Sequence, residues 1–413
     1  MGTQENVVLN PPGAEKLSTA PGAWLVLFVA YIASIVTIMN YMKVSPVMPD
    51  LIAHFKVDLS SAGLMMSVVA FCGLVLGLPA GLFIQKYGIR TVAILATALS
   101  AIGGVLGAIA TNYPVFLASR GLEGIGLTFM ALVGPTVAGI WFPPQKVGLA
   151  MGVSSTCTGV GGFIIMAAAP RIAHSMGGWQ SLWWFTAALS FLSLVLVVIF
   201  VRMPPWMTAA PAGGSAPQAP SLGAGFANRN IWLWAAAYLC VFFPWALYMY
   251  YPTYLTKVHG YTLEKAGLIN SLGSAGTLLG ALLAGILIGK IGIKHLKLTL
   301  VIGIVIFCLL LALSFNISGI AIPIWMIAMG AIGMGAVPVF CMTGVPGIMG
   351  SPQLMGIGMA FAGFGANTGI MIGPPVFGAI VDKAGWNAGA YAFIPMALIG
   401  IFFASMTKIQ KIK

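Results

Sequence analysis

The chain has 413 residues, of which 60% are hydrophobic and only 6% are charged. A water-soluble domain of this length cannot bury so much apolar surface, so the composition excludes a soluble globular protein and predicts an all-α membrane protein. The net charge of +12 does not indicate a nucleic-acid-binding protein, because the basic residues stand singly at the ends of apolar runs.

Twelve apolar segments are long enough to cross a bilayer, which takes about 20 helical residues. They lie near 23–47, 60–82, 90–110, 114–138, 147–170, 180–202, 230–256, 264–288, 296–316, 319–345, 352–381 and 387–407. A stretch rich in Pro, Gly, Ala and Ser separates the sixth from the seventh. We therefore expect five regions: an N-terminal tail (1–22), a six-helix bundle (23–203), a cytoplasmic linker (204–229), a second six-helix bundle (230–407) and a basic C-terminal tail (408–413).

The basic residues predict that both termini are cytoplasmic. In that orientation the inner segments carry twelve: Lys16, Lys86, Arg90, Lys146, Arg202, Arg229, Lys290, Lys294, Lys297, Lys408, Lys411 and Lys413. The outer segments carry five: Lys56, Arg171, Lys257, Lys265 and Lys383. An excess of Lys and Arg on the cytoplasmic side is typical of multi-pass proteins. The polar, proline-bearing start is not a signal peptide, so we expect a multi-pass protein of the inner or plasma membrane.

The second half of the chain repeats the first. Residues 59–67 (LSSAGLMMS) recur at 263–271 (LEKAGLINS), and 81–90 (GLFIQKYGIR) recur at 285–294 (GILIGKIGIK), a shift of 204 residues in both cases. Gly121, Gly124 and Gly126 match Gly330, Gly333 and Gly335 at a shift of 209. Tandem bundles in a membrane are typical of transporters that move a solute between two halves.

The repeated loop resembles the motif between the second and third helices of the major facilitator superfamily, Gly-x-x-x-Asp-Arg/Lys-x-Gly-Arg/Lys-Arg/Lys. The matching residues are Gly81, Lys86, Gly88 and Arg90 in the first copy and Gly285, Lys290, Gly292 and Lys294 in the second. The resemblance covers nearly the whole chain beyond residue 20, and implies a major facilitator fold of two pseudo-symmetric six-helix bundles. Gln85 and Gly289 replace the acid that helps to hold the family's outward-facing state, so that contact is expected to be weaker here.

Charged residues inside a bilayer are costly and usually functional. Apart from residues near the ends of the predicted spans, the interior contains three, Lys43, Arg120 and Glu123, and all lie in the first half. Lys43, with Asn40 one turn deeper, either extends to the outer interface or faces the central pathway. Arg120 and Glu123 are neighbours on one helix face, and form either a static ion pair or a site that exchanges a proton.

The family resemblance and the repeat both bear on these charges. Arg120-x-x-x-Gly124-x-Gly126 resembles the fourth-helix motif of the superfamily, whose arginine is associated with proton coupling. The repeat alignment places apolar residues, Leu247, Met329 and Ile332, at the corresponding positions of the second half. Because one half folds without charges there, structure alone does not require them.

Four more residues are candidate substrate contacts: Tyr248, Tyr251, Asn270 and Asn367. The tyrosines belong either to an interfacial aromatic belt or to a ligand site. The asparagines either hydrogen-bond between helices or contact the substrate. The sequence has no P-loop, zinc-protease or nucleophile-elbow motif, so we expect no enzyme activity, no cofactor and no metal.

Two cations against one carboxylate predict an anionic cargo, provided that all three face the pathway. The leading hypothesis is a monomeric secondary active transporter for a small anion, an organic acid or a cyanate-like ion, that works by alternating access. Glu123 is the candidate proton site, and proton symport, exchange and uniport are the alternative modes of transport. Residues 141–144 (WFPP) and 148–152 (GLAMG) resemble a segment of nitrate, cyanate and monocarboxylate or oxalate carriers of the superfamily. The alternatives are a drug/proton antiporter that exports a lipophilic compound and a receptor on a transporter scaffold.

Overall fold

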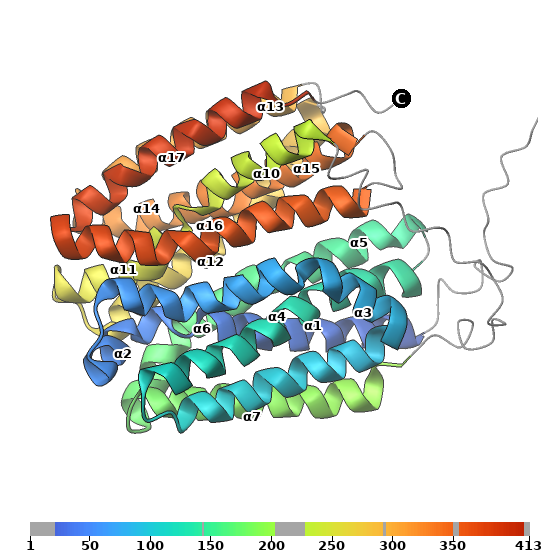
Figure 1. Cartoon of the computed structure of the whole chain (residues 1–413), viewed down its shortest axis with the longest axis horizontal. Helices are drawn as coiled ribbons and strands as arrows, with labels where there is room; N and C mark the ends of the chain where they lie inside the picture. The colour runs from blue at the N-terminus through green and yellow to red at the C-terminus, as the bar shows by residue number, and fades with distance from the viewer. Residues whose placement is uncertain (1–20, 143, 203–227, 292–294, 350–354, 409–413) are drawn as a thin grey trace, which may run out of the picture.

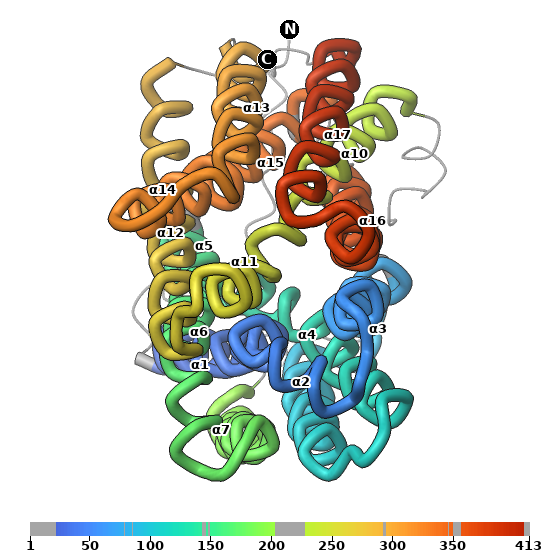
Figure 2. Tube along the Cα trace, turned by 90° about the vertical axis from the view of Figure 1, so that its left-hand side faces the viewer, coloured from blue at the N-terminus to red at the C-terminus, as the bar shows by residue number. Residues whose placement is uncertain are grey.

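The computed structural model describes residues 21–142, 144–202, 228–291, 295–349 and 355–408. Within these ranges 12 helices are long and apolar enough to cross a membrane, which confirms the predicted spans. They form two bundles, one from each half of the chain, lying side by side (Figures 1 and 2). Most of the predicted tails and linker, and the motif residues Gly292 and Lys294, lie outside the described residues.

The elements follow one another in the order of the predicted spans. The first bundle contains α1 (Pro21–Met42), the 3-10 helix η2 (Ser45–Val47), α2 (Met48–Phe55), α3 (Leu59–Ala108), α4 (Tyr113–Trp141), α5 (Pro144–Ser155), α6 (Cys157–Ser175) and α7 (Trp179–Phe200). The second contains α10 (Arg229–Phe242), α11 (Trp245–Lys257), α12 (Leu263–Ile291), α13 (Leu296–Leu313), α14 (Ala321–Met329), the π-helix η4 (Gly330–Ala336), α15 (Val337–Met349), α16 (Met355–Ala384) and α17 (Trp386–Met406).

Four spans that were predicted as single helices are interrupted. The first ends at Met42 because Pro46 offers no N–H to the carbonyl of Met42 and its ring crowds that carbonyl. Pro244 separates α10 from α11 for the same reason. The fifth span breaks at Thr156, and the tenth contains the π-helical η4.

The second and third spans differ from the prediction in the opposite way: the sequence predicts a loop between residues 82 and 90, but the two spans are joined. Helical structure continues there as α3, and only Gly88, with φ 78° and ψ 160°, leaves the helical region. Such a backbone favours a residue without a Cβ atom. The motif glycine therefore makes the turn that lets α3 serve as two spans.

Among the described residues, the two bundles share an apolar core at one end, which we call the far end because both described chain ends lie at the other, the termini end (Figure 1). One apolar core at the far end combines Met65 and Ile165 of the first bundle with Tyr250 and Phe377 of the second. Toward the termini end each bundle has a separate core. With the predicted orientation, the protein is closed toward the outside.

Glycines set how closely neighbouring helices approach, and α12 offers a matched test. A Cβ atom at Gly280 would overlap the carbonyl oxygen of Ala331, whereas one at Gly289 would meet no atom within 4 Å. Gly280→Ala should therefore lower the melting temperature in detergent, since overpacking costs about 1–3 kcal/mol. Gly289→Ala, on the same helix, should not. Equal melting temperatures for the two variants would contradict the close packing of α12 on η4.

Candidate functional site

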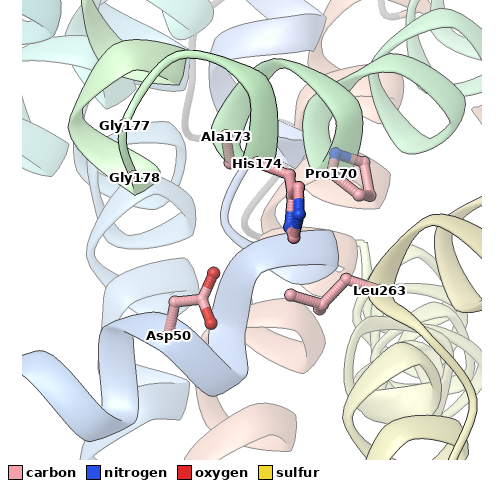
Figure 3. A pocket seen from close by; sticks show the side chains of 7 residues that line it. All are labelled: Asp50, Pro170, Ala173, His174, Gly177, Gly178 and Leu263. Carbon is pink, nitrogen blue, oxygen red and sulfur yellow. The ribbon is translucent and has the colours of Figure 1, made fainter.

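Titratable side chains gather in two places, and the first is a pocket of about 280 Å³ at the far end. Asp50, His174 and Leu263 line it, so that it lies where the two bundles meet (Figure 3). His174 pairs with Glu264 across this junction at 3.7 Å, but its side chain is 82% exposed. A pair this open to water is weak, so the pocket is a poor candidate for the central chemistry.

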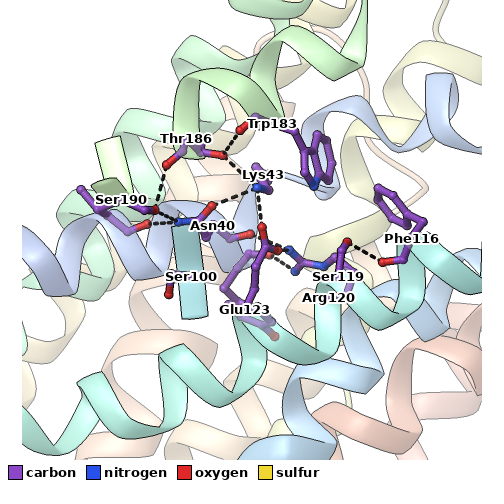
Figure 4. Close-up of polar contacts among 12 residues, drawn as sticks. Asn40, Lys43, Ser100, Phe116, Ser119, Arg120, Glu123, Trp183, Thr186 and Ser190 are labelled. Carbon is purple, nitrogen blue, oxygen red and sulfur yellow. Dashed lines mark hydrogen bonds and ion pairs between the residues drawn. The ribbon is translucent and has the colours of Figure 1, made fainter. Parts of the chain in front are cut away.

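The second place is a buried cluster in which the three predicted charges meet (Figure 4). Lys43 Nζ lies 2.7 Å from Glu123 Oε1, and Arg120 Nη1 donates to Glu123 Oε2. All three residues are at most 2% exposed. Glu123 lies ten residues into α4, about 15 Å from its beginning at Tyr113 and well within the bilayer. The structure contradicts the reading in which Lys43 reaches the outer interface.

The break after α1 explains why Arg120 is needed here. A helix that ends inside the membrane leaves carbonyl groups without partners. Arg120 donates from Nη1 to the carbonyl of Asn40 at 2.8 Å and from Nη2 to that of Tyr41 at 3.0 Å. Its Nε donates to the carbonyl of Met65 on α3 at 3.1 Å. The guanidinium thus caps the C-terminal end of α1, where the negative end of the helix dipole also favours a cation.

The sixth span supplies further partners of Lys43 that the sequence analysis missed. Lys43 Nζ donates to Asn40 Oδ1 at 2.9 Å and to Thr186 Oγ1 at 2.8 Å, and it lies 4.5 Å from the centre of the Trp183 ring. Asn40 Nδ2 in turn donates to Ser190 Oγ at 2.8 Å. Trp183, Thr186 and Ser190 are spaced three and four apart, which places them on one face of α7. This line of polar side chains on an otherwise apolar helix was the sequence signal from which the partners of Lys43 could have been predicted.

The cluster belongs entirely to the first bundle, because its members come from α1, the turn after it, α3, α4 and α7. With Glu123 ionised it carries a net charge of +1, since one carboxylate faces one ammonium and one guanidinium. Each of the three charges also has hydrogen bonds to a charged or polar partner. Charged side chains are tolerated away from water when they are paired and hydrogen-bonded in this way.

The other predicted contacts do not join the cluster. The Tyr248 hydroxyl lies 2.9 Å from the carbonyl of Asn270 and 2.8 Å from Ser274 Oγ. Asn270 Nδ2 lies 3.2 Å from Met166 Sδ of the first bundle, and Asn270 Oδ1 is buried without a hydrogen-bond partner. Tyr248 and Asn270 therefore occupy the junction of α11, α12 and α6.

Tyr251 and Asn367 lie elsewhere. Tyr251 donates to the carbonyl of Ser314 at 3.1 Å and stacks on Trp325 at 4.7 Å, inside the second bundle. Asn367 donates to the carbonyl of Gly363 in its own helix at 3.0 Å and packs at Gly73 of α3, where the bundles meet. Tyr248 and Tyr251 consequently do not face one ligand.

The described motif residues lie toward the termini end. Arg90 donates to the carbonyl of Val198 at 3.0 Å, and Lys86 lies 5.1 Å from the ring of Tyr87. Both contacts stay within the first bundle. A Cβ atom at Gly81 or Gly285 would meet no atom within 4 Å, consistent with bundles that have separated at this end.

The charge balance of the cluster predicts an order of stabilities. Glu123→Gln leaves two buried cations without a counter-ion, so it should destabilise the protein by about 3–5 kcal/mol. Lys43→Met leaves a neutral Arg120–Glu123 pair and should cost less. The double variant that combines Lys43→Met with Glu123→Gln should be more stable than Glu123→Gln alone. Thermal unfolding of the four proteins in detergent measures this order, and a Glu123→Gln protein as stable as the unmodified one would refute the charge balance.

Comparisons with known proteins agree with this architecture. The family model described as Major Facilitator Superfamily matches residues 30–352. The probable sulfoacetate transporter SauU of Cupriavidus necator is 23% identical over 381 residues, covering 87% of this chain and 86% of SauU. The multidrug transporter mfsC of Aspergillus fumigatus is 30% identical over 123 residues, and the match spans only about a quarter (24%) of its length and 30% of this chain.

A solved structure is similar over nearly the whole fold. The bacterial homologue of the human lysosomal transporter Spinster, in an inward-facing and occupied conformation, superposes with a TM-score of 0.77 over 95% of this chain and 98% of its own. Its 16% sequence identity supports the fold alone. From the family match, the twelve spans and the paired bundles, we conclude that this chain belongs to the major facilitator superfamily and is a multi-pass integral protein of the cell membrane.

Proposed function

We propose that the protein transports a small organic anion together with a proton, and that Glu123 is the proton site. The observation that carries this proposal is the sharing of one buried carboxylate by two cations, Lys43 and Arg120. Family membership supports transport itself. The anionic cargo and the proton are inferred from the charges of the cluster.

Charge balance gives the coupling. Protonation of Glu123 changes the net charge of the cluster from +1 to +2, which is unfavourable in a site sealed from water. An anion that binds Lys43 and Arg120 returns the net charge of the cluster to +1. Without the proton, the same anion competes with the Glu123 carboxylate for both cations. Proton and anion therefore favour each other's binding, and such reciprocal coupling is the thermodynamic basis of symport.

The transport cycle follows from the two bundles. We propose that residues 23–203 and 230–407 rock about the cluster, joined by the linker 204–229, with the protein acting as a monomer. Lys43, Asn40 and Arg120 would hold the anion from the first bundle, while Tyr248 and Asn270 approach it from the junction of α11, α12 and α6, and Asn367 from the contact of α16 with α3. Tyr251 points into the second bundle and is not part of this proposal.

The similarity to SauU supports the choice of cargo. SauU is named a probable transporter of sulfoacetate, a small ion with a carboxylate and a sulfonate, and the match extends over most of both chains. Carboxylate and sulfonate oxygens are natural acceptors for an ammonium and a guanidinium. We therefore expect small organic acids, rather than lipophilic cations, to be carried.

Uptake into proteoliposomes tests the proposal directly. Sulfoacetate and small mono- and dicarboxylates should accumulate when the outside is acidic, and collapse of the pH gradient should abolish accumulation. Glu123→Gln should eliminate the response to the gradient, since the proton site is lost. Lys43→Gln should reduce uptake by at least about tenfold, because removal of one partner of a buried charged contact costs more than 1.4 kcal/mol.

Glu264→Gln is the matched control, because Glu264 is an acid that pairs with His174 at the far end and is not in the cluster. It should retain gradient-driven uptake. A Glu123→Gln protein that still accumulates anions in response to the gradient would refute proton coupling at this residue. Transport of a lipophilic cation in exchange for protons, with no anion uptake, would favour the drug/proton antiporter instead.

A further inference from the structure

The turn after α1 connects the buried cluster to the second bundle. Lys43 points into the cluster, and two residues later Ser45 Oγ donates to the carbonyl of Met249 in α11 at 2.6 Å. Lys43, Val44 and Ser45 are all 0% exposed. The same short segment therefore binds the proposed proton site on one side and the opposite bundle on the other.

The bond from Ser45 belongs to a set of three hydrogen bonds that hold the two bundles together at the far end, and we call these three bonds the seal. Tyr250, the residue after Met249, donates from its hydroxyl to the carbonyl of Leu59 at 2.5 Å. Ser60 Oγ donates to the carbonyl of Pro375 on α16 at 3.1 Å. All three bonds join the first bundle to the second, so they must break when the bundles separate at this end. Only Ser45 is also adjacent in sequence to the charge cluster.

We infer that Ser45 is a positioning residue that transmits the charge state of Glu123 to the far-end seal, an inference that rests on the proposed function. With Glu123 ionised, the ion pair holds Lys43, and with it the turn, so that Ser45 stays bonded to Met249. With Glu123 protonated, Lys43 loses its counter-ion and is repelled by Arg120. Because two residues span at most about 7 Å, the turn moves as a unit and Ser45 leaves Met249.

This linkage gives a defined sequence of states. A proton alone opens the far end, and an anion that then binds both cations lets the turn return and the seal re-form. The empty, ionised cluster also keeps the seal closed. The far end is thus closed with both ligands or with neither, and open with the proton alone.

Few other titratable groups surround Glu123. Lys43 and Arg120 contact it, while Tyr41 of α1 and Cys72 of α3 interact electrostatically with Arg120. The α7 side chains that reach the cluster, Trp183, Thr186 and Ser190, do not titrate near neutral pH.

At the far end, His174 lines the pocket together with Asp50 and lies 3.7 Å from Glu264, so this imidazole is a second titratable group beside the seal. Asp382 accepts a bond from the backbone N–H of Ser60 at the same end. All proteins in the experiment therefore carry His174→Gln.

The experiment measures opening of the far end as a distance between two nitroxide labels. Lys56→Cys and Lys383→Cys place the labels on exposed residues of opposite bundles, in a background in which the five native cysteines are replaced by Ala. Double electron–electron resonance is recorded at two pH values, about 8 and about 5.5. Acidification should increase the population with the longer distance.

Ser45→Ala should raise the ratio of open to closed molecules at the higher pH by about fivefold, the effect of losing one hydrogen bond, and should abolish the response to pH. Ser60→Ala is the matched control, because it removes another serine bond across the same seal but is not linked to Lys43. It should favour opening and retain the pH response. Ser45→Thr, which keeps the hydroxyl, should also retain it.

Two results would overturn the inference: a Ser45→Ala protein with the full pH response, or a Ser60→Ala protein that loses the response as completely. Proteoliposome uptake separates this failure from that of the proposed function. Glu123→Gln that abolishes gradient-driven uptake, together with an unchanged response in Ser45→Ala, would eliminate only the role of Ser45. Gradient-driven uptake by Glu123→Gln would remove the proposed function itself.

Discussion

The Glu123 carboxylate is the constraint around which the first bundle is organised. It compensates Lys43 and Arg120 in a region without water, and Arg120 uses its remaining N–H groups on the carbonyls where α1 ends. The break caused by Pro46, the cap supplied by Arg120 and the counter-charge supplied by Glu123 therefore depend on one another. Loss of the carboxylate leaves two buried cations, and loss of the guanidinium leaves an uncapped helix end inside the bilayer.

Much of the fold could be predicted because long apolar runs and a tandem repeat are strong signals in a membrane protein. The twelve spans and the paired bundles follow from them directly. The breaks at Met42 and Phe243 could have been predicted from Pro46 and Pro244, but a hydropathy window averages over such positions. The turn within α3 falls at Gly88, where φ is 78°, so the motif glycine was the local signal for it.

The site was less accessible from sequence than the fold. The rarity of charges in apolar spans identified Lys43, Arg120 and Glu123, but not their geometry. Thr186 and Ser190 resemble the many hydroxyl residues that bond to their own helix, and only the approach of α7 to α1 gives them a second role. Tyr248 and Tyr251 lie three residues apart on α11 but bond to different carbonyls, those of Asn270 and Ser314, and a helical wheel does not contain the neighbours that each hydroxyl meets.

The π-helical segment η4 gives the two halves different inner walls. Gly121 and Gly330 are 209 residues apart, whereas the repeat begins with a shift of 204, so the second half has gained residues before Gly330. Gly333 and Gly335 keep the shift of 209 inside η4. A π-helix closes i→i+5 hydrogen bonds and is wider than an α-helix, whereas α4 is α-helical from Tyr113 to Trp141. The wide turn therefore has no counterpart in α4, and a duplicated scaffold acquires two differently shaped surfaces without a change in topology.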